Sequence, residues 1–485
     1  MTGEKAESPS LLRMDSQRGR MPHVTAVVII GGGPGGYEAA LVAAQNGAEV
    51  TVIERHGIGG SAVLTDCVPS KALIATSEIL TMAGESHNLG VTIHGEPARP
   101  DLLSVRLDEV NARIRELARQ QSVDTRATLI AAGIAVQRGT GRLLAPDRIE
   151  VTSDHGLTQI DADVVLIATG ARPRELPGTD VDGERILNWE QLYNLGELPE
   201  RLIVVGSGVT GAEFASAYRA MGSDVVLVSS RDRVLPAEDA DAAAVLERAF
   251  RRRGVEVRAR SRAQRAVRTG DRVEVFLSDG SVVSGSHCLL AVGSVPNTDG
   301  MGLAEAGVIT DDRGFITVDR VSRTSARGVY AAGDCTGVMM LASTAAMQGR
   351  IAMWHTMGQA VHPLDLRMVS SNVFTEPEIA TVGYSQADVD AGVINADAVT
   401  LGLQTNARAK MQGFDDGFVK LFCRRGTRIV VGGVVVAPKA SELIHAVTMA
   451  VDQRLTVDQV AGTFTVYPSL SGSIAEAARQ LHVTD

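Results

Sequence analysis

A glycine-rich turn that occurs twice limits what this chain can fold into. In the first copy, the β-branched run 26–30 ends in a turn containing Gly31, Gly33 and Gly36, and a helix-forming run follows at 37–44. A second strand then ends at Glu54. Strand, glycine turn, helix and strand in this order predict a parallel β-sheet crossed by helices.

The first copy also has the features of a dinucleotide site. The first glycine of such a turn allows the tight bend, the second lets the backbone approach a pyrophosphate, and the third lets the helix pack closely on the strand. The positive end of the helix favours the pyrophosphate. A carboxylate at the position of Glu54 accepts hydrogen bonds from a ribose diol.

The second copy differs at the position that contacts the ribose. The strand 201–205 leads into the turn 206–211, but the position equivalent to Glu54 is Ser229, and Arg231 and Arg233 follow soon after it. A missing carboxylate with nearby arginines suits the 2′-phosphate of NADPH better than the free hydroxyl of NADH. The alternative is that both arginines are solvated loop charges. We expect NADPH to be preferred and NADH to be used as well.

The composition excludes several classes of protein. The chain has 485 residues, with 47 Lys and Arg against 57 Asp and Glu, a net charge of −10, and an aromatic content of 4%. Nucleic-acid binders need a basic surface or stacking platforms, so we expect no nucleic-acid partner. Four cysteines without a CxxC pair, and ten histidines without a metal-binding spacing, predict neither a disulfide framework nor a metal site.

Membrane and export signals are not seen in the sequence. No apolar run reaches the roughly 18 residues of a membrane helix, and residues 1–23 hold no apolar core of signal-peptide length. We therefore expect a cytoplasmic protein without an integral membrane segment.

The order of the patterns predicts the domain organisation. We expect an α/β fold with two Rossmann-like nucleotide-binding domains and a C-terminal α+β dimerisation domain. Between and after the two fingerprints we expect a long helix at 102–121, buried strands at 163–170 and 288–293, strands at 418–422 and 429–436, and a helix at 442–451. The predicted limits are 1–23 for a disordered extension, 24–165 for the first part of the FAD-binding domain, 166–290 for the NAD(P)H-binding domain, 291–362 for a return segment of the FAD-binding domain, and 363–485 for the dimerisation domain.

The ordered motifs resemble the class I flavoprotein disulfide reductases, which include lipoamide dehydrogenase, glutathione reductase and mercuric reductase. The similarity extends over nearly all of 24–478 and includes both fingerprints and the segments 168–170, 293–297, 329–334 and 374–380. The resemblance implies FAD in the first unit, NAD(P)H in the second, and a homodimer formed by the C-terminal domain. It also implies that Asp334 lies near the ribityl chain and that Lys71, beneath the flavin N5 edge, pairs with Glu213.

The candidate cofactor-binding residues follow from the motifs and the resemblance together. They are Gly31, Gly33, Pro34, Gly35, Gly36, Glu54, Arg55, Gly60, Lys71, Gly141, Thr169, Gly170, Gly206, Gly208, Val209, Gly211, Glu213, Ser230, Arg231, Gly293, Asp334, Leu341 and Ala342.

The catalytic segments depart from the family. Where disulfide reductases have the form G-G-T-C-x-N-x-G-C-x-P-S-K, residues 59–71 read GGSAVLTDCVPSK, so the attacking cysteine has become Ala62 while the second survives as Cys67. The family's base segment H-P-T-x-S-E reads YPSLSG, with Tyr467 and Gly472 in place of the base and its acid. Because an alanine methyl cannot attack sulfur and a phenol of pKa about 10 is a poor base, we infer that the disulfide relay is absent.

The leading hypothesis is an FAD-dependent NAD(P)H dehydrogenase that passes electrons from reduced flavin directly to a small acceptor such as a quinone. It resembles the quinone-reductase branch of the family that lacks the disulfide. The candidate catalytic residues are Lys71, Glu213, Cys67 and Tyr467, with Tyr467 of the other subunit donating a hydrogen bond to a quinone oxygen.

Two alternatives remain open. One is a single-cysteine peroxidase or oxidase, in which Cys67 is acidified near the start of a helix. The other is a flavin-bearing sensor with negligible turnover. For Cys67 a packing role is favoured over a reactive one. Cys335 is a second candidate for a position near the flavin, whereas Cys288 and Cys423 are predicted core residues.

Overall fold

The first nucleotide unit is built on a five-stranded parallel sheet. The computed structural model describes residues 24–99 and 102–482, so the predicted extension 1–23 lies outside the described residues. The sheet order is β20-β9-β1-β2-β5, and the strands are β1 (Ala26–Ile30), β2 (Glu49–Glu54), β5 (Ala135–Arg138), β9 (Val164–Ile167) and β20 (Val329–Ala331).

The alternating side chains of these strands bury two different faces. Val27 and Ile29 of β1 pack against α1 (Pro34–Gln45) and α7 (Ala342–Thr356). Val28 and Ile30 face the antiparallel sheet of β6 (Thr140–Ala145), β7 (Arg148–Ser153) and β8 (Gly156–Asp161). This period of two is what a strand buried on both sides requires.

The second nucleotide unit repeats this architecture. Its parallel sheet has the order β11-β18-β12-β13-β14, formed by β11 (Ile186–Asn188), β12 (Arg201–Val205), β13 (Asp224–Val228), β14 (Glu256–Arg258) and β18 (His287–Leu290). One face is covered by α5 (Val209–Met221) and α6 (Ala240–Arg253), and the other by the antiparallel strands β15 (Ala263–Thr269), β16 (Arg272–Leu277) and β17 (Val282–Gly285).

The C-terminal part is a separate α+β unit. Its antiparallel sheet has the order β21-β22-β25-β24-β23, with β21 (Ser371–Val373), β22 (Glu378–Gly383), β23 (Ala396–Gly402), β24 (Phe418–Arg424) and β25 (Val430–Ala437). Its helices are α8 (Gln386–Asp390), α9 (Ala407–Met411), α10 (Ala440–Asp452), α11 (Val457–Ala461) and α12 (Gly472–Gln480). The α/β class with two Rossmann-like units and a C-terminal α+β domain is therefore confirmed.

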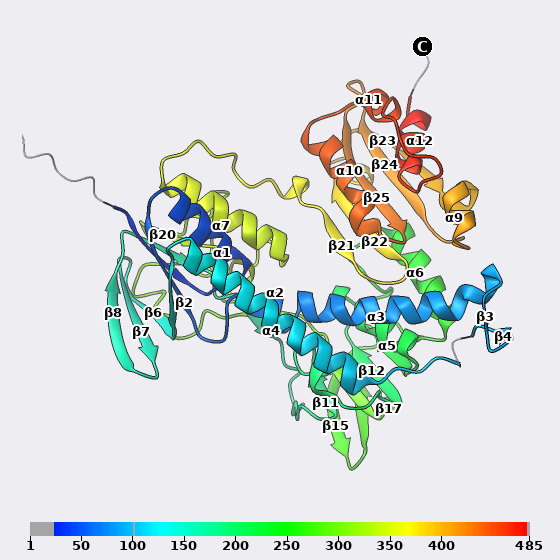
Figure 1. Cartoon of the computed structure of the whole chain (residues 1–485), viewed down its shortest axis with the longest axis horizontal. Coiled ribbons are helices and arrows are strands. Elements are labelled where there is room, and N and C mark those ends of the chain that lie inside the picture. Colours follow the sequence, from blue (N-terminus) through cyan, green and yellow to red (C-terminus); the bar gives the residue numbers. More distant parts are fainter. Residues whose placement is uncertain (1–23, 100–101, 483–485) are drawn as a thin grey trace, which may run out of the picture.

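Two long helices run between the units. They are α3 (Cys67–Glu85), which follows the short α2 (Gly60–Leu64), and α4 (Leu107–Ala131), and both extend from the first unit across the middle of the molecule (Figure 1). The remaining elements are β3 (Thr92–Ile93), β4 (Glu96–Pro97), the two-stranded sheet of β10 (Ala171–Pro173) and β19 (Ser294–Pro296), and the single turns η1 (Ser86–Leu89), η3 (Leu192–Asn194), η4 (Asp334–Thr336), η5 (Leu366–Met368) and η6 (Leu403–Thr405).

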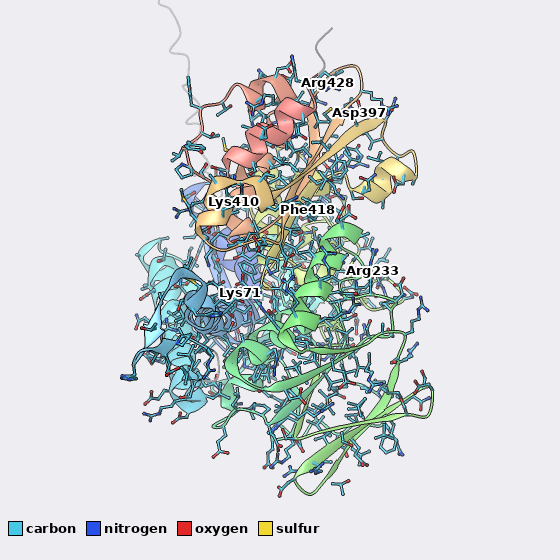
Figure 2. The ribbon with its side chains drawn as sticks, turned by 90° about the vertical axis from the view of Figure 1, so that its right-hand side faces the viewer. Lys71, Arg233, Asp397, Lys410, Phe418 and Arg428 are labelled. Carbon is cyan, nitrogen blue, oxygen red and sulfur yellow. The ribbon has the colours of Figure 1, made fainter. Side chains whose placement is uncertain are left out.

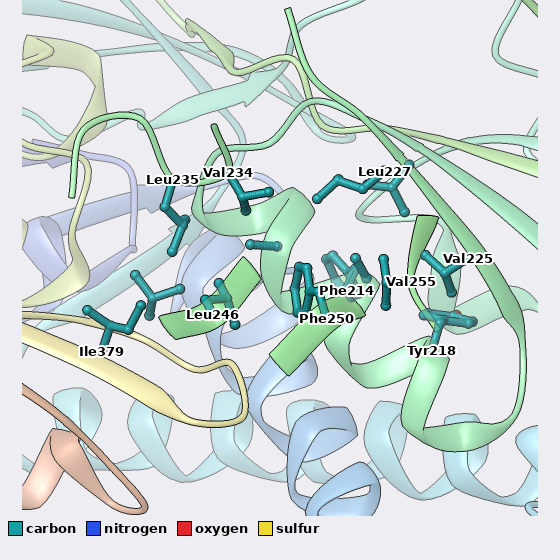
Figure 3. Packing of buried hydrophobic residues seen from close by; sticks show 14 of the residues in the cluster. Phe214, Tyr218, Val225, Leu227, Val234, Leu235, Leu246, Phe250, Val255 and Ile379 are labelled. Carbon is teal, nitrogen blue, oxygen red and sulfur yellow. The ribbon is translucent and has the colours of Figure 1, made fainter. Parts of the chain in front are cut away.

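One hydrophobic core joins the second unit to the C-terminal unit. Phe214 and Tyr218 of α5 and Phe250 of α6 pack together, and Ile379 of β22 reaches the same cluster (Figure 3). Phe418 of β24 also belongs to this cluster, and the turned view shows it near the boundary between the two units (Figure 2). The shared core fixes the orientation of the C-terminal unit on the second one, because interiors this dense resist sliding.

The predicted long helix at 102–121 is displaced along the chain. The observed α4 runs from Leu107 to Ala131, because its buried face continues through Ile114 and Ala118 to Leu129. Gly133, with a φ of 77°, then ends the helical segment.

The return of β20 and α7 to the first unit bears on the domain limits. Both elements follow the second unit in the chain, yet β20 pairs with β9 and α7 packs on α1. We propose 24–165 with 291–362, 166–290 and 363–485 as the three domains, called the first, second and third domains below. Within the described ranges, no helix has the length and apolar character needed to cross a membrane.

Candidate functional site

The first glycine turn is built so that only glycine fits at two of its positions. Gly31 has a φ of 106°, and a Cβ added to it would lie 2.2 Å from the carbonyl oxygen of Ala168. A Cβ on Gly36 would lie 1.9 Å from the carbonyl oxygen of Gly31. The chain therefore bends tightly after β1 and brings the start of α1 close to the sheet, where its free N–H groups form an anion site.

The carboxylate of Glu54 lies beside this turn. Its Oε2 accepts the backbone N–H of Gly32 at 2.7 Å, and its Oε1 accepts that of His56 at 2.7 Å. Each carboxylate oxygen accepts more than one hydrogen bond, so the group can bind a diol while it holds the turn.

A cavity of about 790 Å³ opens in front of the turn. It lies within the range of about 300–1,000 Å³ that is usual for ligand sites. Gly33 and Gly60 form part of its wall, and a Cβ on Gly60 would lie 2.9 Å from the Cα of Gly33. Of the candidate residues, the cavity is lined by Gly31, Gly33, Pro34, Gly35, Glu54, Arg55, Gly60, Gly141, Thr169, Gly170, Asp334 and Ala342, and by Cys67.

Three other candidates adjoin the cavity lining or the turns that lead to it. Gly36 packs α1 on the sheet, Leu341 directly precedes α7, and Gly293 has a φ of 96° in the turn before β19. Asp334 follows β20 on the cavity wall, where burial raises the pKa of its carboxyl to about 6 and the negative charge of Asp66 adds to the shift. These residues form a cavity with an anion site, a diol acceptor and a protonatable carboxyl, which fits the parts of FAD.

Lys71 and Glu213 form an ion pair between the first two domains. The Nζ of Lys71 on α3 donates to the Oε2 of Glu213 on α5 at 2.7 Å, and the Glu213 side chain is only 4% exposed. Burial lowers the pKa of Lys71, but the attraction and hydrogen bond of Glu213 outweigh it, so the pKa lies above its ordinary value. The lysine is therefore a permanent cation at the start of α3, close to Cys67.

The surviving cysteine of the motif is not acidified. Cys67 is half-buried at the first position of α3, where burial raises the pKa of its thiol to about 12, Asp66 adds to the shift and Lys71 opposes it. Ala62 lines the same cavity without a second sulfur. The alternative in which Cys67 is acidified at the helix start is therefore not supported, because loss of water outweighs the nearby cation.

The other three cysteines are packing residues. Cys335 is fully buried, and its thiol donates to the carbonyl oxygens of Ala332 and Ile167 at 3.3 and 3.6 Å rather than lining the cavity. The position of Cys335 near the flavin that we considered is therefore not supported. Cys288 and Cys423 are completely buried, as predicted for core residues.

The second glycine turn has the geometry of the first. Gly206 has a φ of 113°, and its added Cβ would lie 2.1 Å from the carbonyl oxygen of Ala291, while that of Gly211 would lie 1.9 Å from Gly206. Gly208 has open space in front of it, and Val209 at the start of α5 is 41% exposed. A pyrophosphate can therefore approach this backbone as well.

In the loop after β13, some polar side chains form hydrogen bonds that hold the loop, and others are exposed to solvent. The hydroxyl of Ser229 is buried and lies 2.6 Å from that of Ser207. The Nη2 of Arg233 donates to the carbonyl oxygens of Pro236 and Glu238 at 3.1 and 3.3 Å, so this guanidinium is tied to the loop and its grouping with Arg231 as a phosphate ligand is not supported. Ser230 and Arg231 are exposed.

The structure adds a second arginine to this region. The backbone N–H of Arg260, just after β14, donates to the carbonyl oxygen of Arg231 at 2.7 Å, and both side chains are exposed. In the part of the chain that is described, neither guanidinium has an ion-pair partner. The sequence could have indicated Arg260 as a candidate only if the end of β14 had been predicted to lie next to the end of β13.

Tyr467 lies on the surface of the third domain. Tyr467 is 86% exposed, and the neighbouring Phe464 and Val466 are exposed as well. Tyr467 does not line the cavity of its own chain.

Three carboxylates that line the cavity were missed from the sequence, and they belong to Asp66, Glu190 and Asp299. Asp66 lines it next to Cys67, and Glu190 lines it from the second domain, where its Oε1 accepts the hydroxyl of Thr65 at 3.2 Å. Asp66 stands where the motif form has glycine, which was the available signal. Glu190 lies far along the chain in a loop without a motif, so only the fold brings it here.

Comparisons with known proteins agree with this architecture. Residues 25–349 match the model of the pyridine nucleotide-disulphide oxidoreductases, and residues 369–478 match the dimerisation domain of that family. NAD(P)H dehydrogenase (quinone) from Mycobacterium tuberculosis is 54% identical over 472 residues, which are 95% of each chain. Dihydrolipoyl dehydrogenase from Chlamydia trachomatis is 32% identical over 453 residues, 93% of this chain and 95% of the relative.

Solved structures show the same relationship. The crystal structure of LpdA from Mycobacterium tuberculosis superimposes with a TM-score of 0.90 at 53% identity, and the match covers 95% of this chain and 100% of that one. The flavoprotein disulfide reductase RclA from Escherichia coli shares the fold, with a TM-score of 0.83 at 24% identity over 94% of this chain and 100% of that one. The family uses FAD and NAD(P)H, which the two glycine turns and the cavity accommodate. The chain is a member of the pyridine nucleotide-disulphide oxidoreductase family, with the family's dimerisation domain at its C-terminal end.

Proposed function

We propose that this protein is an FAD-dependent NAD(P)H dehydrogenase that passes electrons from reduced flavin directly to a small acceptor such as a quinone. One observation carries the proposal. The cavity holds the glycine turn, Glu54 and Asp334 but only one cysteine in its lining, Cys67, and burial raises the pKa of that thiol to about 12. The Lys71–Glu213 pair does not line the cavity, but its lysine lies four residues after Cys67 on α3. The similarity to an M. tuberculosis protein named NAD(P)H dehydrogenase (quinone) supports the same acceptor.

The residues of the chain have distinct tasks in this proposal. When bound, FAD supplies the chemistry that accepts a hydride and releases two electrons. The N–H groups at the start of α1 bind its pyrophosphate, Glu54 accepts its ribose hydroxyls, and Asp334 holds the ribityl chain. Lys71 would supply the positive charge that favours the anionic form of a reduced flavin bound in the cavity. Glu213 positions that ammonium group.

The coenzyme site favours NADPH. Ser229 replaces the carboxylate that would bind a free ribose hydroxyl, and its hydroxyl is occupied within the turn. Arg231 and Arg260 remain free for a 2′-phosphate, with Ser230 as an added donor. NADH is used with lower affinity, because the glycine turn and the start of α5 bind the part that both coenzymes share.

The protein acts as a homodimer through its third domain. The apolar side chains of Phe464 and Val466 are 104% and 77% exposed in the single chain, and a partner subunit covers them. Tyr467 then reaches the cavity of the other subunit and donates a hydrogen bond to a quinone oxygen. The substrate site is thus completed by the second copy.

The test is an anaerobic titration of the purified FAD-containing protein with NADPH, followed by a screen of acceptors. The flavin alone should take up two electrons, and quinones should be reduced faster than disulfides or peroxides. Cys67→Ser should keep quinone turnover. Uptake of four electrons by the wild type would support a cysteine-dependent enzyme instead. The same would follow if the wild type preferred peroxide as acceptor and Cys67→Ser lost its turnover. Slow flavin reduction despite tight NADPH binding would point to a sensor.

A further inference from the structure

Asp66 is an N-cap residue that does not cap its helix. It directly precedes α3, and aspartate at this position usually accepts a hydrogen bond from a free N–H of the first turn. Here the side chain makes no capping hydrogen bond, whereas the backbone carbonyl of Asp66 accepts the N–H of Ser70. The carboxyl lines the cavity instead. The Asp66 carboxyl therefore does not stabilise the start of α3 by capping, and it is available to a ligand in the cavity.

The surroundings of Asp66 favour a carboxyl that carries a proton. It is half-buried, Cys67 follows it, and Glu190 lines the cavity beside it. Burial raises the pKa of Asp66, Lys71 opposes this shift, and the negative charges of Glu213 and Glu190 add to it. A group of this kind holds a proton nearer to neutral pH than a free aspartate does.

The reaction proposed above needs a proton donor for the acceptor. Reduction of a quinone by NADPH consumes one proton in addition to the hydride, and the positions of the family's base dyad hold Tyr467 and Gly472. A general acid within the cavity removes this difficulty, since it delivers the proton as the quinone oxygen becomes negative.

We propose that Asp66 is the general acid that protonates the reduced acceptor, an inference that rests on the proposed quinone reductase function. The O–H bond of the Asp66 carboxyl breaks and an O–H bond of the hydroquinone forms. The quinone gains two electrons and one hydrogen, which derive from the hydride of NADPH, and NADPH is oxidised to NADP⁺. The Asp66 carboxylate then takes a proton from solvent, which closes the balance.

Asp66→Asn in the FAD-containing protein tests this role by separate half-reactions. The amide has nearly the same shape but no proton to transfer, so flavin reduction by NADPH should stay within about twofold, while reoxidation by a quinone at pH 7 should slow by about a hundredfold. Ferricyanide accepts single electrons and needs no proton, so its rate should not change. Asp124→Asn, on the exposed face of α4, is the matched control.

Two further measurements keep the result interpretable if Asp66→Asn does not bind FAD. In the wild type, quinone reoxidation should fall as pH rises through the titration of Asp66, and Asp66→Glu should restore most of the rate. A pH titration of the oxidised flavin absorbance should show a transition in the wild type that is shifted in Asp66→Glu. The comparison with the variant separates Asp66 from the other groups that face it, which are Cys67, Lys71, Glu190, Tyr193, Glu213 and Asp334.

Each failure has a different signature. If the reduced wild type does not react with quinones at all, the proposed function fails. If the wild type reacts, three results would show that Asp66 is not the acid. The first is that quinone reoxidises Asp66→Asn as fast as the wild type, and the second is that reoxidation of this variant by ferricyanide slows as much as reoxidation by quinone. The third is that the rate of quinone reoxidation in the wild type does not depend on pH.

Discussion

The Nζ of Lys71 lies 2.7 Å from the Oε2 of Glu213, and the Oε1 of the same carboxylate accepts the backbone N–H of Phe374 at 2.9 Å. The ammonium group also lies 4.9 Å from the centre of the Phe374 ring. One buried carboxylate therefore joins α3 of the first domain, α5 of the second and the start of the third. The charge next to the cavity is held by all three domains at once.

Replacement of Glu213 by glutamine should affect both stability and catalysis. The variant leaves Lys71 without a counter-charge, and we expect a loss of about 2 kcal/mol in unfolding free energy, below the usual figure for buried pairs because Lys71 is one-third exposed. Flavin reduction by NADPH should slow by about tenfold, since the ammonium loses its position. Urea unfolding and stopped-flow absorbance measure the two effects. The exposed Glu442→Gln is the control, and equal behaviour of both variants would contradict the assignment.

A restored first cysteine should not restore disulfide chemistry. In Ala62→Cys the new thiol lines the same cavity as Cys67, but Tyr467 stands in place of the histidine base and Gly472 in place of its acid. Lipoamide and oxidised glutathione should therefore remain poor substrates, while quinone reduction continues. Steady-state turnover with each acceptor checks this, and rapid disulfide reduction by the single variant would show that the loss of the relay is not what determines the acceptor.

Coenzyme choice should depend on two arginines from neighbouring strand ends. Arg231→Ala and Arg260→Ala should each weaken the binding of 2′,5′-ADP by about tenfold, the usual loss for one charge-assisted hydrogen bond, and should leave 5′-AMP unaffected. Isothermal titration calorimetry measures both ligands without turnover. Arg262→Ala removes a nearby exposed charge and should change neither affinity. If only Arg231→Ala has an effect, Arg260 is a solvated charge.

The buried lysine of the third domain should matter for stability alone. The Nζ of Lys420 donates to Asp239 at 2.8 Å and to Asp241 at 2.6 Å, and its side chain is 2% exposed. Lys420→Met leaves Asp239 buried without its partner, so we expect a loss of about 3 kcal/mol in unfolding free energy. Lys410→Met, at an exposed position of the same domain (Figure 2), is the control. A neutral effect of Lys420→Met in urea unfolding would contradict the prediction.

His287 should make the protein less stable in mild acid. Burial lowers the pKa of His287 to about 4, Arg185 and Arg268 act in the same direction, and Asp182 opposes them. In the unfolded state the histidine has a pKa of about 6.5. Below about pH 6.5 the unfolded state therefore binds a proton at His287, whereas the folded state does not until the pH is much lower. The contribution of His287 to the free energy of unfolding is therefore fully present above about pH 6.5 and is lost as the pH falls towards 4.

The comparison of two variants isolates this effect. The urea midpoint should fall less between pH 7 and pH 5 in His287→Gln than in the wild type, whereas His155→Gln, at an exposed turn, should follow the wild type. Parallel midpoints for all three proteins would show that His287 does not contribute.

Local sequence was sufficient wherever one short segment carries both the geometry and the chemistry. The turns at Gly31–Gly36 and Gly206–Gly211 need glycine for steric reasons that act within a few residues, and their flanking strands formed where the β-branched runs predicted them. The loss of the first cysteine at Ala62 could likewise be recognised from the motif alone. These features together determined the α/β class and the kind of cofactor.

Only the tertiary structure decided which charged groups meet. Arg233 was indistinguishable from Arg231 by position, yet its guanidinium is held by Pro236 and Glu238 while Arg260 lies beside Arg231. Whether Cys67 is acidified depended on the balance between water excluded by the fold and a cation on the same helix, and exclusion was stronger. Burial and long-range electrostatics arise from elements far apart in the chain, so no local pattern contains them.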